Sequence, residues 1–112
     1  MSCIFCEIAA RRAPADIVFQ DEHVTAFMDK HPRAPTHILI IPNSHIESVD
    51  AIADDAAAWQ AAQCLRAARE IARARGLSGY RLITNTGADA GQAVFHLHFH
   101  LLAGRKMGWP LG

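Results

Sequence analysis

His96-Leu97-His98-Phe99-His100-Leu101-Leu102 is a run in which three histidines alternate with bulky apolar residues. Successive side chains of a β-strand point to opposite faces of a sheet, so the run predicts a strand from Val94 to Ala103 with three imidazoles on one face. The other face would carry the apolar side chains of Phe95, Leu97, Phe99 and Leu101. Three imidazoles in a row offer a nucleophile, proton carriers or metal ligands near neutral pH.

The residues alone leave three explanations of this histidine face. The histidines are incidental on a solvent-facing strand, although three at strict alternation are a rare coincidence. They form a catalytic zinc site, but neighbouring positions lie about 6.5–7 Å apart at the backbone, which strains three short bonds to one ion. In the third, one imidazole attacks phosphorus or an acyl carbon while another carries the leaving-group proton. The preceding loop, Gly87–Gln92, favours phosphoryl chemistry because glycines let backbone N–H groups approach an anion.

The rest of the chain predicts a single α+β domain over residues 1–112. Four further strands are expected, with the first two forming a hairpin and the third buried: Ile17–Phe19, Val24–Met28, His37–Ile41 and Tyr80–Thr84. A short helix is expected from Cys3 to Arg12, and a long alanine-rich helix from Asp54 or Asp55 to Arg75, followed by Gly76. Core contacts from the long helix and the residues just before it are expected at Ile52, Trp59, Leu65 and Ile71. Five strands with short connections predict an antiparallel sheet.

Composition excludes several classes of partner. The chain has 112 residues, 51% hydrophobic and 20% charged, with 11 basic and 11 acidic residues. A net charge of zero does not suit binding to nucleic acid. A run of about 18 apolar residues is absent, so we expect no membrane-spanning segment. The first seven residues do not resemble a signal peptide, and we therefore expect a cytoplasmic protein with reduced thiols.

Cys3-x-x-Cys6 has three interpretations: two reduced thiols, a redox-active pair, or half of a tetrahedral zinc site completed by two histidines. His45 and the histidine run supply candidates for the other half. Cys64 is expected in the core.

Other residues have ordinary interpretations beside functional ones. The isolated histidines His23 and His31 are expected at the surface, and His37 has no assigned role from its position alone. Asp29 follows a strand, where it is either a turn residue or a ligand-contacting carboxylate. Four apolar residues form either ordinary core or an apolar slot: Phe5, Ile8, Phe27 and Leu39.

The histidine run matches the signature of the histidine triad (HIT) family, H-φ-H-φ-H-φ-φ, where φ is apolar. The resemblance extends over nearly the whole chain, through Ile4-Phe5, Ala26–Asp29, Ala34–His37, Ile41–Ile46, Gly91–Phe95 and the tail Gly104–Pro110. The tail and the Gly-Gln before the triad resemble the Hint branch, the nucleoside phosphoramidases.

This resemblance implies the HIT fold and a homodimer whose protomers pair through their long helices and join their sheets. It implies cleavage of a purine nucleotide at its α-phosphate, with His98 as nucleophile, His100 assisting at the phosphate and leaving group, and His37 supporting the triad. Asp29 resembles the ribose contact. The base slot corresponds to Phe5, Ile8, Phe27 and Leu39, and the phosphate side to Asn85, Gly91 and Gln92. Trp109 resembles a tail residue that reaches the neighbouring subunit's site.

Two departures from the branch carry consequences. Many Hint relatives have serine at position 93, and Ala93 has no hydroxyl to offer there. Cys3-x-x-Cys6 resembles a subset of bacterial members that bind structural zinc through residues matching Cys3, Cys6, His45 and His96. That ligand set leaves the other triad histidines free for catalysis without a catalytic cofactor.

The sequence thus leads to the expectation of a hydrolase or transferase acting on purine nucleoside 5′-phosphoramidates or adenylated amines through a nucleotidyl-His98. Two alternatives stay open. One is hydrolysis of dinucleoside polyphosphates, an activity of a neighbouring branch. The other is a nucleotide-binding regulatory dimer with weak activity, which Ala93 keeps open.

Overall fold

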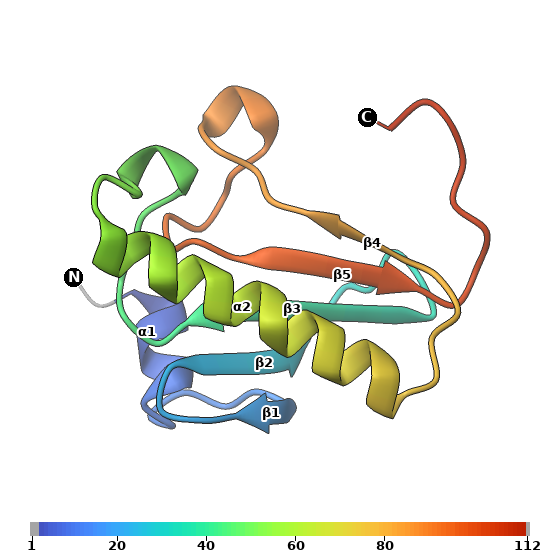
Figure 1. Ribbon diagram of the computed structural model, residues 1–112, viewed down its shortest axis with the longest axis horizontal. Coiled ribbons are helices and arrows are strands. Elements are labelled where there is room, and N and C mark those ends of the chain that lie inside the picture. The colour runs from blue at the N-terminus through green and yellow to red at the C-terminus, as the bar shows by residue number, and fades with distance from the viewer. Residues whose placement is uncertain (1–2, 112) are drawn as a thin grey trace.

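The computed structural model describes residues 3–111 and shows a five-stranded antiparallel sheet in the order β1-β2-β3-β5-β4 (Figure 1). The strands are β1 (Ile17–Gln20), β2 (Val24–Met28), β3 (Thr36–Pro42), β4 (Tyr80–Ile83) and β5 (Phe99–Ala103). The helices are α1 (Ile4–Ala9) and α2 (Asp55–Ala74), with two short 3₁₀ helices, η1 (Val49–Ala51) and η2 (Ala88–Ala90). The predicted α+β class, with an antiparallel sheet, one long helix and one short helix, is confirmed.

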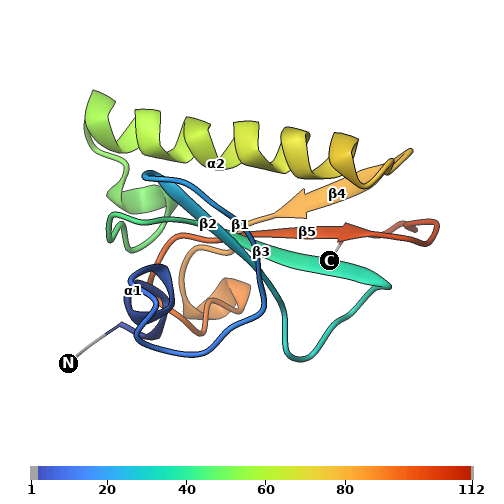
Figure 2. The same ribbon diagram turned by 90° about the horizontal axis from the view of Figure 1, so that it is seen from below.

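Helix α2 begins and ends where its sequence predicts. The carboxylate of Asp54 accepts the backbone N–H of Ala57 at 2.9 Å, which satisfies one of the free donors of the first turn. The helix ends at Ala74, and Gly76 follows the cap residue Arg75 with a φ of +65°, a left-handed conformation that glycine adopts readily. Figure 2 shows α2 on one face of the sheet, with α1 and the segment containing η2 on the opposite face.

The strands build two cores because alternate side chains point to opposite faces. On β3, Ile38 and Ile40 pack with α2, whereas Leu39 and Ile41 pack with Phe5 of α1. The continuous apolar run of β3 is therefore buried on both faces, as predicted. The face of the sheet opposite α2 carries the histidine side chains that are described in the next subsection.

The predicted histidine strand from Val94 to Ala103 is wrong in its first half, because β5 begins only at Phe99. The last ladder pair joins Ile40 to Phe99, and β3 ends at Pro42, which has no N–H for further pairing. The Pro42 carbonyl instead accepts the Nε2–H of His96 at 2.8 Å. The expected apolar face is also incomplete, since Phe95 is 52% exposed.

Helical predictions need three corrections. Trp59 and Leu65 of α2 are 47% and 48% exposed, so they do not belong to the core of the protomer, whereas Ile71 is buried. Helix α1 ends at Ala9, short of Arg12, because the chain turns through a left-handed conformation at Arg11. The two 3₁₀ helices were not expected. Within residues 3–111, no helix has both the length and the hydropathy required to cross a membrane.

Candidate active site

Two adjacent strands bring catalytic-type side chains together on the sheet face opposite α2. In the register of β3 with β5, His37 pairs with Leu102, and His100 pairs with Leu39. His98 immediately precedes β5, and the centroids of its ring and the His100 ring lie 5.1 Å apart. The structure therefore brings together His37, His98 and His100, the three residues expected to carry catalysis.

The His98 imidazole is buried and held in one tautomer. Its Nδ1 lies 2.7 Å from the backbone carbonyl oxygen of His96. A carbonyl oxygen only accepts hydrogen bonds, so Nδ1 carries the proton and Nε2 keeps a free lone pair. An imidazole in this state is a nucleophile that needs no prior deprotonation.

A chain of hydrogen bonds fixes the protons of the other two histidines. The backbone N–H of Arg33 donates to His37 Nδ1 at 3.0 Å, so the proton of neutral His37 lies on Nε2. That Nε2–H faces His100 Nδ1 at 2.9 Å and the Asp29 carboxylate at 3.4 Å. Since His100 accepts at Nδ1, its own proton lies on Nε2, where it is available as a hydrogen-bond donor.

Burial keeps both relay histidines neutral. It lowers the pKa of His100 to about 4, with the nearby His98 and His37 adding to the effect and Asp29 opposing it. Burial also lowers the pKa of His37, against the opposing charge of Asp29. At neutral pH the site thus presents a neutral N–H donor at His100 rather than an imidazolium.

Two cavities meet at Asp29. The first, of about 590 Å³, is largely apolar, and its lining includes all four predicted base-slot residues, Phe5, Ile8, Phe27 and Leu39. The second, of about 350 Å³, is lined by His37, His100, Asn85 and others. Asp29 and His31 line both cavities. One Asp29 oxygen accepts the His31 N–H at 2.7 Å, which fixes the carboxylate at this junction.

The residues expected on the phosphate side are placed differently from one another. Asn85 lines the smaller cavity, whereas the Gln92 amide is occupied by backbone groups, accepting from Gly87 N–H at 2.8 Å and donating to Glu47 O at 2.7 Å. Gly91 ends η2 with a φ of +92°. Trp109 is 84% exposed in the tail, away from the described cavities of its own protomer.

Sequence reasoning missed two contributors to the site. His31, expected at the surface, is exposed but lines both cavities. Arg33 sets the His37 tautomer through its backbone N–H. The position of His31 two residues after Asp29 was an available signal, whereas a backbone donor leaves no mark in the sequence.

A second cluster, of cysteines and histidines, lies beside the nucleophile. The ligand atoms of Cys3, Cys6, His45 and His96 all lie within 4.8 Å of one another. His96 Nδ1 is 3.3 Å from Cys3 Sγ and 3.5 Å from Cys6 Sγ, and His45 Nδ1 is 3.4 Å from Cys6 Sγ. Tetrahedral zinc with ordinary Zn–S and Zn–N bonds would separate sulfur and nitrogen ligands by about 3.5 Å. The donor set and its spacing therefore fit structural zinc.

Tautomers separate this cluster from the catalytic one. His96 donates its Nε2–H to Pro42, which leaves the Nδ1 lone pair facing the two sulfurs, as a metal ligand requires. Asp29, His37 and His100 also lie close enough to hold an ion. There, however, the Arg33 N–H occupies the second ring nitrogen of His37, so its Nε2 carries a proton and not a lone pair. The first cluster fits a metal, and the second is a hydrogen-bond relay.

The thiols do not resemble a redox-active pair. Burial, reinforced by the neighbouring Cys3, raises the pKa of the Cys6 thiol. Redox-active C-x-x-C cysteines have lowered pKa values. Cys64 behaves as the sequence predicts, since it is fully buried on the core-facing side of α2, where burial raises its pKa to about 12.

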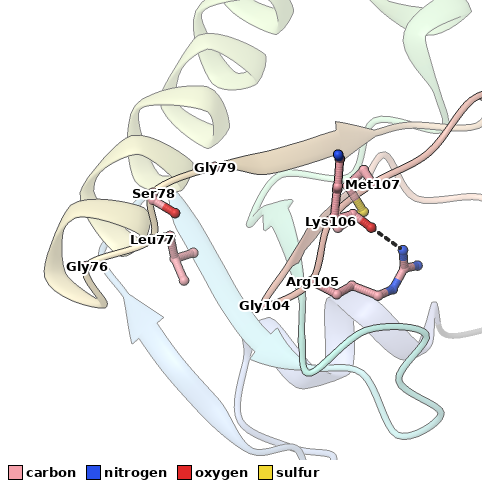
Figure 3. A pocket seen from close by; sticks show the side chains of 8 residues that line it. All are labelled: Gly76, Leu77, Ser78, Gly79, Gly104, Arg105, Lys106 and Met107. Atoms are coloured by element: carbon pink, nitrogen blue, oxygen red, sulfur yellow. Dashed lines mark hydrogen bonds between the residues drawn. The ribbon is translucent and has the colours of Figure 1, made fainter.

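A third cavity, of about 680 Å³, lies between two turns remote from the histidines (Figure 3). Its lining consists of Gly76–Gly79 after α2 and Gly104–Met107 after β5. It contains none of the predicted site residues. Arg105, one of its lining residues, donates to the Arg33 carbonyl at 3.2 Å.

Comparison with known proteins agrees with this geometry. The family model described as "HIT domain" matches residues 10–107. Purine nucleoside phosphoramidase of Escherichia coli is 49% identical over 109 residues, covering 94% of this chain and 89% of the relative. A solved HIT family hydrolase from Legionella pneumophila superimposes with a TM-score of 0.94 at 46% identity, covering 99% and 100% of the two chains. A histidine triad nucleotide-binding protein from Candida albicans gives 0.81 at 30% identity, covering 99% and 85%.

Proposed function

The chain belongs to the HIT family, and from that premise we propose that it cleaves purine nucleoside 5′-phosphoramidates or adenylated amines at the α-phosphate through a covalent nucleotidyl-His98. Its homology to a HIT family hydrolase and to a purine nucleoside phosphoramidase supports the class of reaction. The observation that carries the proposal is the paired tautomers of the site. A free Nε2 lone pair on His98 stands beside an Nε2–H donor on His100.

In this mechanism the Nε2 lone pair of His98 forms a bond to the α-phosphorus. The bond from phosphorus to the amine nitrogen breaks, and the nitrogen leaves with its electron pair and takes up a proton from solvent, while the neighbouring His100 N–H donates a hydrogen bond at the phosphate and leaving group. Water then attacks the phosphorus and gives a proton to solvent, the P–N bond to His98 breaks with its electron pair returning to Nε2, and the nucleoside monophosphate departs. The His100 N–H also stabilises negative charge on the phosphoryl oxygens.

The nucleotide would span the junction of the two cavities. The apolar slot beside Phe5 and Phe27 suits a purine ring, and the Asp29 carboxylate suits the ribose hydroxyls. The phosphate then points toward His98 and His100, with Asn85, Gly91 and Gln92 on the phosphate side as the family resemblance implies. Asp29 lines both cavities, which supports this arrangement.

Zinc, in this proposal, is structural and held by Cys3, Cys6, His45 and His96. The ion would cross-link α1 to the segment that precedes β5, and it takes no part in the reaction. Free thiols and a zinc site of this kind suit a reducing compartment, so we assign the protein to the cytoplasm. We also treat residues 1–112 as one domain without a nucleic-acid or membrane partner.

A homodimer completes the proposal. Trp59 and Leu65 are exposed on α2, and Tyr80, on the edge strand β4, is 41% exposed. An exposed apolar helix face beside an unpaired strand edge is the surface that a second protomer would cover. The exposed Trp109 would then reach the partner's site.

The test is release of AMP from an adenosine 5′-phosphoramidate carrying an alkylamine, measured for the wild type and His98→Ala. We expect turnover by the wild type alone, with AMP binding retained by the variant. Turnover by His98→Ala would refute the covalent mechanism. Faster cleavage of a diadenosine polyphosphate than of the phosphoramidate would favour the neighbouring enzyme branch, and AMP binding without any turnover would favour the regulatory dimer.

A further inference from the structure

The segment that carries His98 is held by side chains rather than by the sheet. β5 begins at Phe99, so neither His96 nor His98 is paired in the ladder with β3. One backbone anchor of the segment is the Leu97 N–H, which donates to Ile46 O at 2.6 Å. A nucleophile outside the ladder needs a further anchor to keep its ring in one orientation.

His96 supplies that anchor through its side chain and its backbone carbonyl. Its side chain is fully buried, with Nε2–H bound to Pro42 O and Nδ1 facing the sulfurs of Cys3 and Cys6. Its backbone carbonyl accepts the Nδ1–H of His98 at 2.7 Å. One residue thus joins the cysteine cluster through its ring and the nucleophile through its carbonyl.

Phe5 forms a second link between the cluster and the nucleophile. It lies between the two cysteines at the start of α1, and its ring meets His96 and His98 edge-on at centroid distances of 5.9 and 5.1 Å. The same ring lines the apolar slot. A displacement of α1 would therefore reach both the His98 ring and the slot.

We propose that Cys3, Cys6 and His45 are positioning residues for the nucleophile: by clamping the His96 ring they hold its carbonyl where that oxygen selects the tautomer and orientation of His98. This inference rests on the proposed function for its effect on turnover. Loss of the clamp leaves the sheet and its ladder in place and frees His98 to exchange tautomers. A misoriented nucleophile lowers kcat, whereas the substrate still binds through the slot and Asp29.

The test compares wild type, Cys6→Ser and His45→Gln by two independent readouts. The first is the ¹⁵N spectrum of the His98 ring, which distinguishes the Nδ1–H from the Nε2–H tautomer and does not depend on turnover. The second is steady-state kinetics on the phosphoramidate. We expect mixed His98 tautomers in both variants and a fall in kcat of at least about tenfold, with KM changed less than about threefold. Stripping the wild type with a chelator should give the same spectrum, and adding Zn²⁺ should restore it.

Cys64→Ala is the matched control, since it removes a buried thiol from the core-facing side of α2 and changes no clamp residue. It should lower the unfolding midpoint while leaving kcat and the His98 spectrum unchanged. If Cys6→Ser does not fold, His45→Gln serves alone, because His45 is exposed and contributes one hydrogen bond and one edge-on ring contact to the cluster.

A single Nδ1–H tautomer in the clamp variants would overturn the proposal, as would an equal loss of kcat in Cys64→Ala. If the wild type itself releases no AMP, the proposed function fails, and the His98 spectra still decide whether the clamp positions the ring.

Discussion

His100 combines a buried ring with a role as a neutral donor, and this has a consequence for stability. Its pKa in the folded protein is about 4, and that of an ordinary histidine is 6.5. Between these values the unfolded chain binds more protons than the folded chain, so stability is fully present above pH 6.5 and is lost as pH falls toward 4. The lowered pKa of His37 acts in the same direction.

We therefore expect the free energy of unfolding to fall between pH 7.5 and 4.5, and to fall less in His100→Asn. A shift of this size corresponds to at most about 3 kcal/mol, and solvent screening at this half-buried ring reduces the contribution. Urea unfolding of both proteins at several pH values measures the difference. Effects of acid elsewhere in the chain are common to both proteins. Parallel curves for the two would contradict the assignment.

Ala93 is the residue at which the chain departs from many relatives of its branch. A serine hydroxyl donating to a charged phosphoryl group contributes about 1–3 kcal/mol. We expect Ala93→Ser to raise kcat about fivefold or more, which the phosphoramidate assay measures. Ala90→Ser, an exposed change in η2, is the control and should leave kcat unaltered. An unchanged rate in Ala93→Ser would show that position 93 does not limit turnover.

At the scale of elements, the turn after β5 brings Gly104 close to Pro35. A Cβ on Gly104 would lie 2.7 Å from Pro35 Cβ, and Gly104 has a φ of +94°. Gly104→Ala combines a collision with backbone strain, so we expect a loss of stability of about 1–3 kcal/mol. Gly108→Ala, where an added Cβ meets open space, should cost less than about 0.5 kcal/mol. Thermal unfolding distinguishes the two, and equal midpoints would contradict the steric argument.

The sequence predicted the elements better than it predicted the histidine segment. The continuous apolar run of β3 correctly indicated a buried strand, since β3 pairs with β2 on one side and with β5 on the other. Alternation failed before Phe99, since Pro42 has no N–H to extend the ladder and the His96 carbonyl is taken by the His98 ring. Hydrogen bonds from side chains to the backbone determine the conformation of such a segment, and the periodicity of apolar residues gives no indication of these bonds.

Hydrogen bonds to the backbone also explain why the sequence predicted the residues of the site but not the tautomers of its histidines. The three histidines expected on one face divide between two clusters. The His96 ring contacts Cys3 and Cys6, whereas the His98 and His100 rings contact each other. Backbone groups determine the tautomers in the catalytic cluster: the His96 carbonyl determines that of His98, and the Arg33 N–H determines that of His37. Almost every residue has a backbone carbonyl and an N–H group, so the residue types in a sequence do not indicate which of these groups bind a histidine ring.

At the scale of the whole molecule, α2 carries exposed apolar side chains that the protomer itself does not cover. The sequence shows that Trp59 and Leu65 are apolar but not whether the sheet of the protomer covers them, and their assignment to the protomer core was wrong. Within residues 3–111, Gln60 Oε1 and Thr84 Oγ1 are also buried without a hydrogen-bond partner. Both lie on elements that the proposed dimer would bring together, α2 and the end of β4.

Removing apolar area from this face should therefore separate the protomers without unfolding them. We expect the double variant Trp59→Gln/Leu65→Gln to sediment as a monomer at concentrations where the wild type is a dimer, because each substitution removes apolar surface that only a partner buries. Circular dichroism should show an unchanged fold, since both side chains are about half exposed in the protomer. Arg66→Gln/Arg69→Gln alters the same helix at exposed charged positions and should stay dimeric. If Trp109 reaches the partner's site, the monomer should also lose activity on the phosphoramidate; a fully active monomer would remove the tail from the site, and a dimeric double variant would place the interface elsewhere.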